Sequence, residues 1–221
     1  MTRWQRFIEE YGKTLFCNDI APLQVPKKNF DWLKKEVFNS KKTGIKHNKR
    51  LAGHIKEEYY MEKVTPDFHD FLCSQAINHK SFARHNKKLD ILSEDRPLFL
   101  ENLWVNFQKK HEFNPIHDHT GLFSFVIFVK IPYDIYKEEN YFSEVGRGDR
   151  KHSFTETSKL NFLNIEPNGT IVTTSVPVDK SFEGKMFMFP AKQCHLVYPF
   201  YTSDEYRITI SGNLKIKAQK L

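Results

Sequence analysis

The chain has 221 residues, of which 39% are hydrophobic and 28% charged, with 20 Phe and 9 Tyr. This balance excludes a disordered chain, and no apolar run approaches the roughly 18 residues that span a bilayer. Lys and Arg total 34 against 27 Asp and Glu, a formal net charge of +7, so the surface attracts anions, nucleic acid among them. A chain of this length can hold one sizeable core or two small ones, and we expect a single domain over residues 1–221.

The cysteines and the N-terminus indicate the compartment. Cys17, Cys73 and Cys194 are odd in number and form no CxxC motif. They favour neither a disulfide framework nor a zinc ribbon, and they indicate a reducing environment. The first residues, MTRWQRFIEEYGK, lack the apolar segment of a signal peptide. We therefore expect a cytoplasmic protein without a membrane partner.

Residues 1–96 are predicted to be mainly helical with loops. The segment 65–85 opens with Thr65, which suits an N-cap, and Pro66, which suits the first helical position. Its apolar stripe consists of Phe68, Phe71, Leu72 and Ala76. The segment 29–39 repeats this spacing with Phe30, Leu33 and Val37. Residues 39–53 are rich in lysine and are expected to form a basic loop.

From about residue 97 the pattern changes to short β-rich runs separated by turns, which predicts a sandwich or barrel. These runs are residues 100–108, 122–131, 159–165, 170–178, 185–189, 195–201 and 206–216. Asn168-Gly169 lies between two of them and is typical of a type I′ hairpin turn, in which both positions need positive φ. The polar stretch 137–159 is expected to be a long loop that covers a functional site.

Two histidines, His117 and His119, precede the longest apolar run, and Asn114-Pro115 just before them indicates a loop arriving at a strand. Alternate side chains of an extended strand share a face, so both histidines would point the same way and Asp118 the opposite way. The pair can therefore reach one metal ion. An equally simple interpretation is two partly exposed histidines at a strand edge.

A third histidine, His195, lies where one predicted strand ends and the next begins, far enough downstream to come from another strand. Two neighbouring ligands and one distant ligand describe a facial triad, which leaves coordination positions open for substrate and oxygen. Taken alone, His195 could be a buried, hydrogen-bonded histidine.

The last predicted strand alternates an apolar face with a polar face that carries Arg207, Thr209 and Ser211. An arginine fork binds a carboxylate through two parallel charge-assisted hydrogen bonds, and Thr209 could add a third. The alternative is that Arg207 forms a salt bridge at the edge of the cavity. On an earlier strand, Trp104 and Asn106 alternate with Leu103, Val105 and Phe107 in the same manner.

Residues 103–132 and 184–213 resemble the 2-oxoglutarate- and iron(II)-dependent dioxygenases of tailed phages and bacteria, relatives of the prolyl hydroxylases. The resemblance covers roughly residues 97 to 214 and, less specifically, RLAGHIKEEY at 50–59. It implies a mainly β fold with flanking helices: a double-stranded β-helix, a jelly-roll barrel like that of the cupins. The barrel would occupy residues 97–216, with residues 1–96 packed on it.

The family pattern is HxD or HxH, a distal His, and an Arg about a dozen residues later with Ser or Thr two beyond. It matches His117, His119, His195, Arg207 and Thr209. The resemblance implies iron(II) held by the histidines and 2-oxoglutarate paired with Arg207. Dioxygen would then drive decarboxylation to succinate and hydroxylation of a C–H bond. Asn106 would help to hold the cosubstrate, or it makes a structural hydrogen bond.

One position departs from the superfamily, which uses a carboxylate as the second ligand. Here His119 stands there, and Asp118 would face the other way unless the strand were broken, so we predict His119 as the ligand. Three neutral histidines leave the ion its full +2 charge, which favours a dianionic cosubstrate. Because three-histidine sites also occur in other barrels, this departure leaves iron-driven turnover open.

Two other functions fit the same residues. A three-histidine cupin, either a thiol dioxygenase or an isomerase, would need no 2-oxoglutarate and would leave Arg207 with Thr209 unexplained. A non-catalytic jelly-roll module, such as a basic nucleic-acid binder, would show salt-dependent affinity for DNA or RNA. The prime substrate is undetermined: a protein side chain, a nucleobase, a lipid or a small molecule. If a phage encodes the chain, we expect it in the host cytoplasm.

Overall fold

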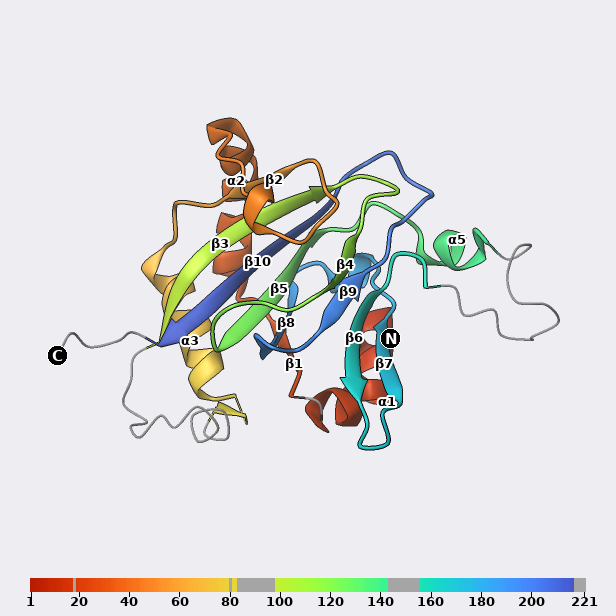
Figure 1. Ribbon diagram of the computed structural model, residues 1–221. Coiled ribbons are helices and arrows are strands. Elements are labelled where there is room, and N and C mark those ends of the chain that lie inside the picture. The colour runs from red at the N-terminus through yellow and green to blue at the C-terminus, as the bar shows by residue number, and fades with distance from the viewer. Residues whose placement is uncertain (18, 80, 83–97, 143–155, 217–221) are drawn as a thin grey trace.

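The computed structural model describes residues 1–17, 19–79, 81–82, 98–142 and 156–216. Eight strands in chain order form its β core (Figure 1). They are β3 (Leu98–Gln108), β4 (Asn114–His117), β5 (Phe123–Lys130), β6 (Leu160–Ile165), β7 (Ile171–Val176), β8 (Lys185–Pro190), β9 (His195–Val197) and β10 (Arg207–Ile216). All seven β-rich runs predicted from the sequence therefore contain strands.

The strands form two antiparallel sheets. One has the order β1-β8-β5-β10-β3-β2 and the other β4-β9-β6-β7. From β3 to β10, every connection crosses from one sheet to the other except the β6–β7 hairpin. This is the predicted double-stranded β-helix, formed by two facing sheets (Figure 1). Aromatic side chains fill the space between them, including Phe162 from β6 and Phe187 and Phe189 from β8.

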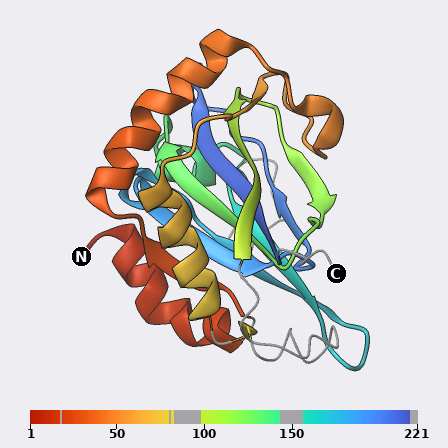
Figure 2. The ribbon, with the colours of Figure 1, turned by 90° about the vertical axis from the view of Figure 1, so that its left-hand side faces the viewer.

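A second apolar core lies between the outer face of the six-stranded sheet and two helices, α2 (Lys27–Thr43) and α3 (Pro66–Ile77), which lie across that face (Figure 2). The predicted stripes are buried here: Leu33 and Val37 from α2, Phe68, Leu72 and Ala76 from α3. The apolar residues that alternate with polar ones along β3 and β10 pack against these helix residues. They are Leu103, Val105, Phe107, Ile208 and Ile210. The polar residues between them along β3 and β10 consequently face the other sheet.

The start of α3 is as predicted. Thr65 is its N-cap, and its side-chain oxygen accepts a hydrogen bond from the Phe68 amide at 3.3 Å. Helix α2 is longer than the pattern indicated, because it continues to Thr43 and ends at Gly44, whose φ of 71° suits a residue without a Cβ. The basic segment 39–53 is therefore partly helical, and it also contains the short helix η1 (Asn48–Arg50).

The N-terminal part does more than pack on the core. Helix α1 (Arg3–Cys17) leads into β1 (Ala21–Gln24), which pairs with β8, and β2 (Glu58–Tyr60) pairs with β3. These two strands form the edges of the six-stranded sheet. The prediction of a mainly helical part with loops over residues 1–96 did not include these two strands, because neither short strand shows an alternation of its own.

Two predictions about loops need correction. The β6–β7 hairpin turns at Pro167-Asn168, closed by the Gly169 amide donating to the Glu166 carbonyl, and of these residues only Gly169 has positive φ. This is a type I turn followed by glycine, not type I′. The predicted loop 137–159 begins inside helix α5 (Ile135–Asn140), and residues 143–155 lie outside the described part. A further short helix, η2 (Lys180–Phe182), precedes β8.

Within the described residues, no helix combines the length and apolar character needed to cross a membrane.

Candidate metal centre

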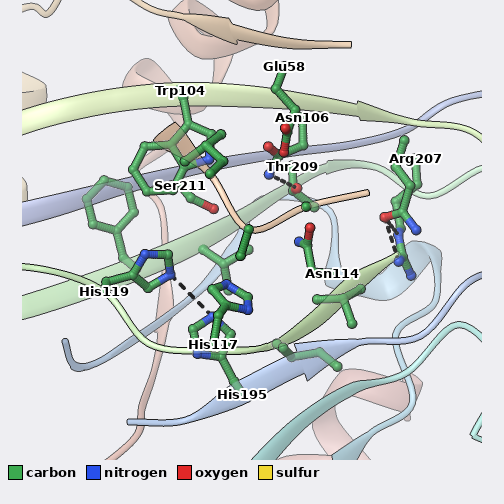
Figure 3. Close-up of a pocket in the computed structure, with 18 of the residues that line it drawn as sticks. Glu58, Trp104, Asn106, Asn114, His117, His119, His195, Arg207, Thr209 and Ser211 are labelled. Carbon is green, nitrogen blue, oxygen red and sulfur yellow. Dashed lines mark hydrogen bonds between the residues drawn. The ribbon is translucent and has the colours of Figure 1, made fainter. Parts of the chain in front are cut away.

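The HxH segment lies where β4 ends. His117 is the last residue of the strand, whereas His119 lies beyond it and is held by its backbone N–H, which donates to the Ala191 carbonyl at 2.8 Å. The strand thus begins at Asn114 and includes Pro115, so the expected loop before the histidines is itself extended. Both imidazoles nevertheless point into the same cavity, as predicted (Figure 3).

The third histidine joins them from the neighbouring strand. His195 opens β9 and lies directly opposite His117 in the β4–β9 ladder. One ligand nitrogen of each of the three imidazoles lies within 4.8 Å of the others. The Nε2 atoms of His119 and His195 are 3.3 Å apart. Such a convergent set of three nitrogen donors can hold a transition-metal ion and leave its other positions open.

Backbone carbonyls orient two of the rings. The Nδ1 atom of His117 lies 2.7 Å from the Pro115 carbonyl oxygen, and that of His195 lies 2.9 Å from the Gln193 carbonyl oxygen. An Nδ1–H that donates to a carbonyl leaves the Nε2 lone pair for a metal. Trp104 packs against His119, and Phe189 against His195, with ring centroids 5.6 and 5.0 Å apart. The surrounding aromatic rings restrict the histidine side chains.

Burial keeps the three imidazoles neutral. Burial is the main cause that lowers the pKa of each histidine, to about 4 for His119 and well below the usual value for His195. The His117 ring adds to the lowering at both of these neighbours. Only neutral imidazole can ligate a metal, so the donor set fits a divalent cation at neutral pH.

Asp118 points away from this cluster. Its carboxylate lies 3.3 Å from the Lys192 ammonium, and both side chains are exposed to solvent. The described residues that gather closely enough for a metal are the three histidines, without an acidic group. This geometry favours His119 over Asp118 as the second ligand.

The polar face of the six-stranded sheet forms the wall of the cavity opposite the histidines. Its residues stand in cross-strand rows, with Arg207 opposite Gln108, Thr209 opposite Asn106, and Ser211 opposite Trp104. All six line a cavity of about 210 Å³ together with the histidines (Figure 3). The predicted alternation of β10 and β3 therefore delivers these side chains to one site.

Arg207 is buried, with 3% of its surface exposed. Its guanidinium donates to the side-chain oxygen of Gln108 from two nitrogens, at 2.9 and 2.7 Å, and to the Tyr133 hydroxyl at 3.2 Å. It also donates to the carbonyls of Ser158 and Tyr198. All these acceptors are neutral, and among the described residues Arg207 makes no ion pair. The alternative, a salt bridge at the cavity edge, is not found among the described residues, and the buried guanidinium borders the pocket without an ion-pair partner there.

Asn106 and Thr209 form the next row. The amide nitrogen of Asn106 donates to the Thr209 hydroxyl at 3.2 Å. This is the structural hydrogen bond that the sequence left as an alternative. The side-chain oxygen of Asn106 is buried and has no hydrogen-bond partner.

Several pocket residues were not singled out from the sequence. Residues 50–53, Glu58 and Asn114 line the cavity beside Asn106. The first two belong to RLAGHIKEEY, so the weaker resemblance in the N-terminal part pointed to a true part of the pocket. No local signal identifies Asn114 or Gln108.

Comparisons with known proteins found a family model and solved structures that are similar to this chain. The family model described as "Putative 2OG-Fe(II) oxygenase" matches residues 102–213. The crystal structure of a Pseudomonas putida prolyl-4-hydroxylase is similar with a TM-score of 0.52 and 11% identity, over 93% of this chain and 97% of that chain. An oxidoreductase of the 2OG-Fe(II) oxygenase family from Burkholderia pseudomallei has a TM-score of 0.48 and 12% identity, over 94% and 89% of the two chains. No curated protein matches this chain.

Proposed function

The chain belongs to the 2-oxoglutarate–iron(II) oxygenase family, and from this premise we propose that it hydroxylates a C–H bond of its prime substrate. As a member, it is an oxygenase whose cofactor is iron(II) and whose cosubstrates are 2-oxoglutarate and dioxygen. The hydroxylation, the identity of the substrate and the role of each residue are the proposal. The observation that carries it is the cluster of three neutral histidines facing a buried arginine across one cavity.

His117, His119 and His195 would hold the iron. Their nitrogen donors converge, two of the rings are oriented by carbonyls, and burial keeps them unprotonated. When bound, the metal supplies the oxidative chemistry that couples decarboxylation of 2-oxoglutarate to hydroxylation. The protein's share is to hold the metal, to orient the cosubstrate and to exclude water. Three neutral ligands leave the metal's charge at +2, which favours a dianion.

Arg207 and Thr209 would bind the far carboxylate of 2-oxoglutarate, with help from the Asn106 amide. The buried guanidinium has no acid partner among the described residues, so an anion in the cavity would compensate its charge. The nearby Glu138 carboxylate is already engaged by the backbone N–H groups of Tyr201 and Thr202. Gln108 now occupies the fork of the guanidinium, so a bidentate carboxylate would displace it.

The cupin alternative leaves this arginine without a role, and the binding-module alternative leaves the histidine cluster without one. We therefore rank both below the oxygenase. The bacterial prolyl-4-hydroxylase shares the fold at an identity too low to assign its substrate here. A protein side chain, a nucleobase and a small molecule all stay candidates. A cytoplasmic location, a phage origin, nucleic-acid binding and a single domain over residues 1–221 also stay predictions.

An anaerobic titration tests the proposal. The iron(II)-loaded protein is titrated with 2-oxoglutarate while the weak visible charge-transfer absorption of a keto acid chelated to iron is followed. Appearance of this band supports the oxygenase. Iron binding without a band would favour the cupin, and no iron binding would favour the binding module.

A further inference from the structure

A row of three polar side chains crosses the sheet beside the metal centre. Glu58 of β2 lies directly opposite Asn106 of β3, which in turn lies opposite Thr209 of β10. Directly opposed residues share a face, so the Glu58 carboxyl projects into the same cavity as the other two. In Figure 3, Glu58, the histidines and Arg207 stand at three corners of the pocket, and the Asn114 amide lies between them.

Acceptor oxygens without partners gather at the Glu58 corner. The side-chain oxygens of Asn106 and Asn114 are buried and accept no hydrogen bond, and Asn106 itself is only 5% exposed. One carboxyl oxygen of Glu58, Oε2, accepts from the Asn48 amide at 3.1 Å. Its Oε1 lies beside Gly53. Unmet buried acceptors are costly, so this corner suits a ligand that brings several donors.

Gly53 keeps the corner open. A Cβ at this position would lie 2.7 Å from Oε1 of Glu58 and closer still to the Asn114 side-chain oxygen. Both oxygens therefore face the same small space beside the Gly53 backbone. The φ of Gly53 is not in the left-handed region, so its lack of a side chain serves space and not backbone conformation.

The charges at this corner favour a cation. Glu58 is 1% exposed, and burial raises the pKa of its carboxyl to about 8, with the Glu112 carboxylate adding to the effect. The neighbouring cations Lys46 and Arg50 are exposed to solvent, which screens them. The two amide oxygens offer no donor to an anion, so this corner does not suit 2-oxoglutarate. The Glu58 carboxyl is mostly neutral at pH 7 in the empty cavity, and it becomes a counter-charge when a cation binds. A bound cation would offset the cost of burying the carboxylate.

From these contacts we infer that Glu58, Asn106 and Asn114 receive a cationic nitrogen group, ammonium or guanidinium, of the prime substrate. The inference rests on the proposed function, because it assigns this group to the molecule that is hydroxylated. Such a group carries several N–H donors and a positive charge, which match three acceptor oxygens and one buried acid. The substrate class is therefore basic: an amine- or guanidine-bearing side chain or small molecule.

Binding of simple probes tests the inference without turnover. The full chain is loaded with zinc(II), which has no redox chemistry, and labelled with ¹⁵N so that the Asn106 and Asn114 side-chain amides can be followed by NMR. Butylammonium and butylguanidinium are titrated beside butanol and butyrate, which match them in length. We expect the two cations to shift both amides and to bind at least about tenfold more tightly than the alcohol.

Two variants and a control locate the effect. Glu58→Gln keeps the shape but cannot ionise when a cation binds, so it should weaken the binding of both cations about tenfold. Gly53→Ala displaces the ends of two side chains and no backbone, so it should do the same without unfolding the protein. Glu57→Gln is the control, because Glu57 faces away to Lys41 and Tyr206. Equal binding of cations and alcohol, or unchanged cation binding in Glu58→Gln, overturns the inference.

Failure of this inference can be distinguished from failure of the proposed function. If the keto-acid band appears with iron but the cations show no preference, the oxygenase stands and the substrate class is wrong. If the cations bind as expected and no band appears, the proposed function fails, and with it the assignment of the cation to a hydroxylated substrate.

Discussion

His117 and His195 lie directly opposite each other across the β4–β9 ladder, with their ring centroids 4.2 Å apart. The pairing of two short strands thus sets the separation of two candidate metal ligands that are distant in sequence. His119 completes the set from just beyond β4, with its ring centroid 5.0 Å from each of the other two. Removing one ligand leaves the other two in place, so the predictions below can be tested ligand by ligand.

His195→Ala should lose iron(II) binding, because two imidazoles alone rarely retain the metal against buffer. The measurement is iron stoichiometry after anaerobic loading and desalting. His69→Ala is the matched control, since His69 lies on α3, which covers the opposite face of the six-stranded sheet. Full iron occupancy in His195→Ala would remove this residue from the ligand set.

The second ligand is decided by a pair of variants. Asp118→Asn should bind iron as the unaltered chain does, because the Asp118 carboxylate pairs with Lys192 at the surface. His119→Ala should lose at least about tenfold in iron affinity. Both affinities come from competition with a chromophoric chelator. The reverse result would show that the segment rearranges on binding and that Asp118 is the ligand.

Arg207→Leu should weaken 2-oxoglutarate at least about tenfold while iron still binds, because the cavity loses its only buried guanidinium among the described residues. This change also leaves Gln108, Tyr133 and two carbonyls without their donor, so urea unfolding must show that the variant folds. Arg207→Lys retains the charge and should have intermediate affinity. Equal affinity for 2-oxoglutarate in all three proteins would contradict the assigned role.

Thr209→Val is a milder test of the same subsite. It keeps the shape and removes one hydroxyl, so the affinity for 2-oxoglutarate should fall about fivefold, equivalent to one hydrogen bond of about 1 kcal/mol. Titration of the keto-acid band measures it. Thr173→Val provides the comparison, because Thr173 is an exposed residue of β7. A loss of the same size in both variants would indicate a general effect of the substitution.

Stability should fall as pH rises from 7 to 9, and Glu58 should be one cause. Its folded pKa of about 8 exceeds the value of 4.5 expected for the unfolded chain, so the folded state holds the extra proton. The stabilisation is complete below pH 4.5 and is lost as pH rises through 8. The part of this stabilisation that is lost between pH 7 and 9 is about 1.4 kcal/mol. The pKa values of the three histidines are lowered from the ordinary value of 6.5. Above that pH the histidines are neutral in both the folded and the unfolded chain, so they do not change the stability between pH 7 and 9.

Urea unfolding of the metal-free protein and of Glu58→Gln at pH 7 and 9 checks this prediction. The difference between the two proteins isolates Glu58 from other titrating groups, including the Glu112 and Lys46 charges that act on it. Glu58→Gln should lose less stability over this range. Parallel pH profiles would show that the carboxyl is already ionised at pH 7.

The sequence alone determined seven of the eight strands of the core, the polar faces of β3 and β10, and the order of the three histidines and Arg207. These features are local: alternation with period two is enough to decide which side chains share a face, and the spacing of the motif shows which strands carry it. The N-cap of α3 at Thr65 could be predicted for the same reason, because it depends on neighbouring residues. The partners of hydrogen bonds across the sheet could not be predicted from the sequence.

Only the tertiary structure showed that β2 adds to the edge of β3, and this pairing distinguishes Glu58 from Glu57. The two acids are adjacent and chemically identical, yet one faces the cavity opposite Asn106 and the other faces Lys41 and Tyr206. The satisfied donors of Arg207 depend likewise on Gln108, Tyr133 and two loop carbonyls that converge from distant parts of the chain. Register between strands far apart in sequence is set by the packing of the whole core, and no local pattern encodes it.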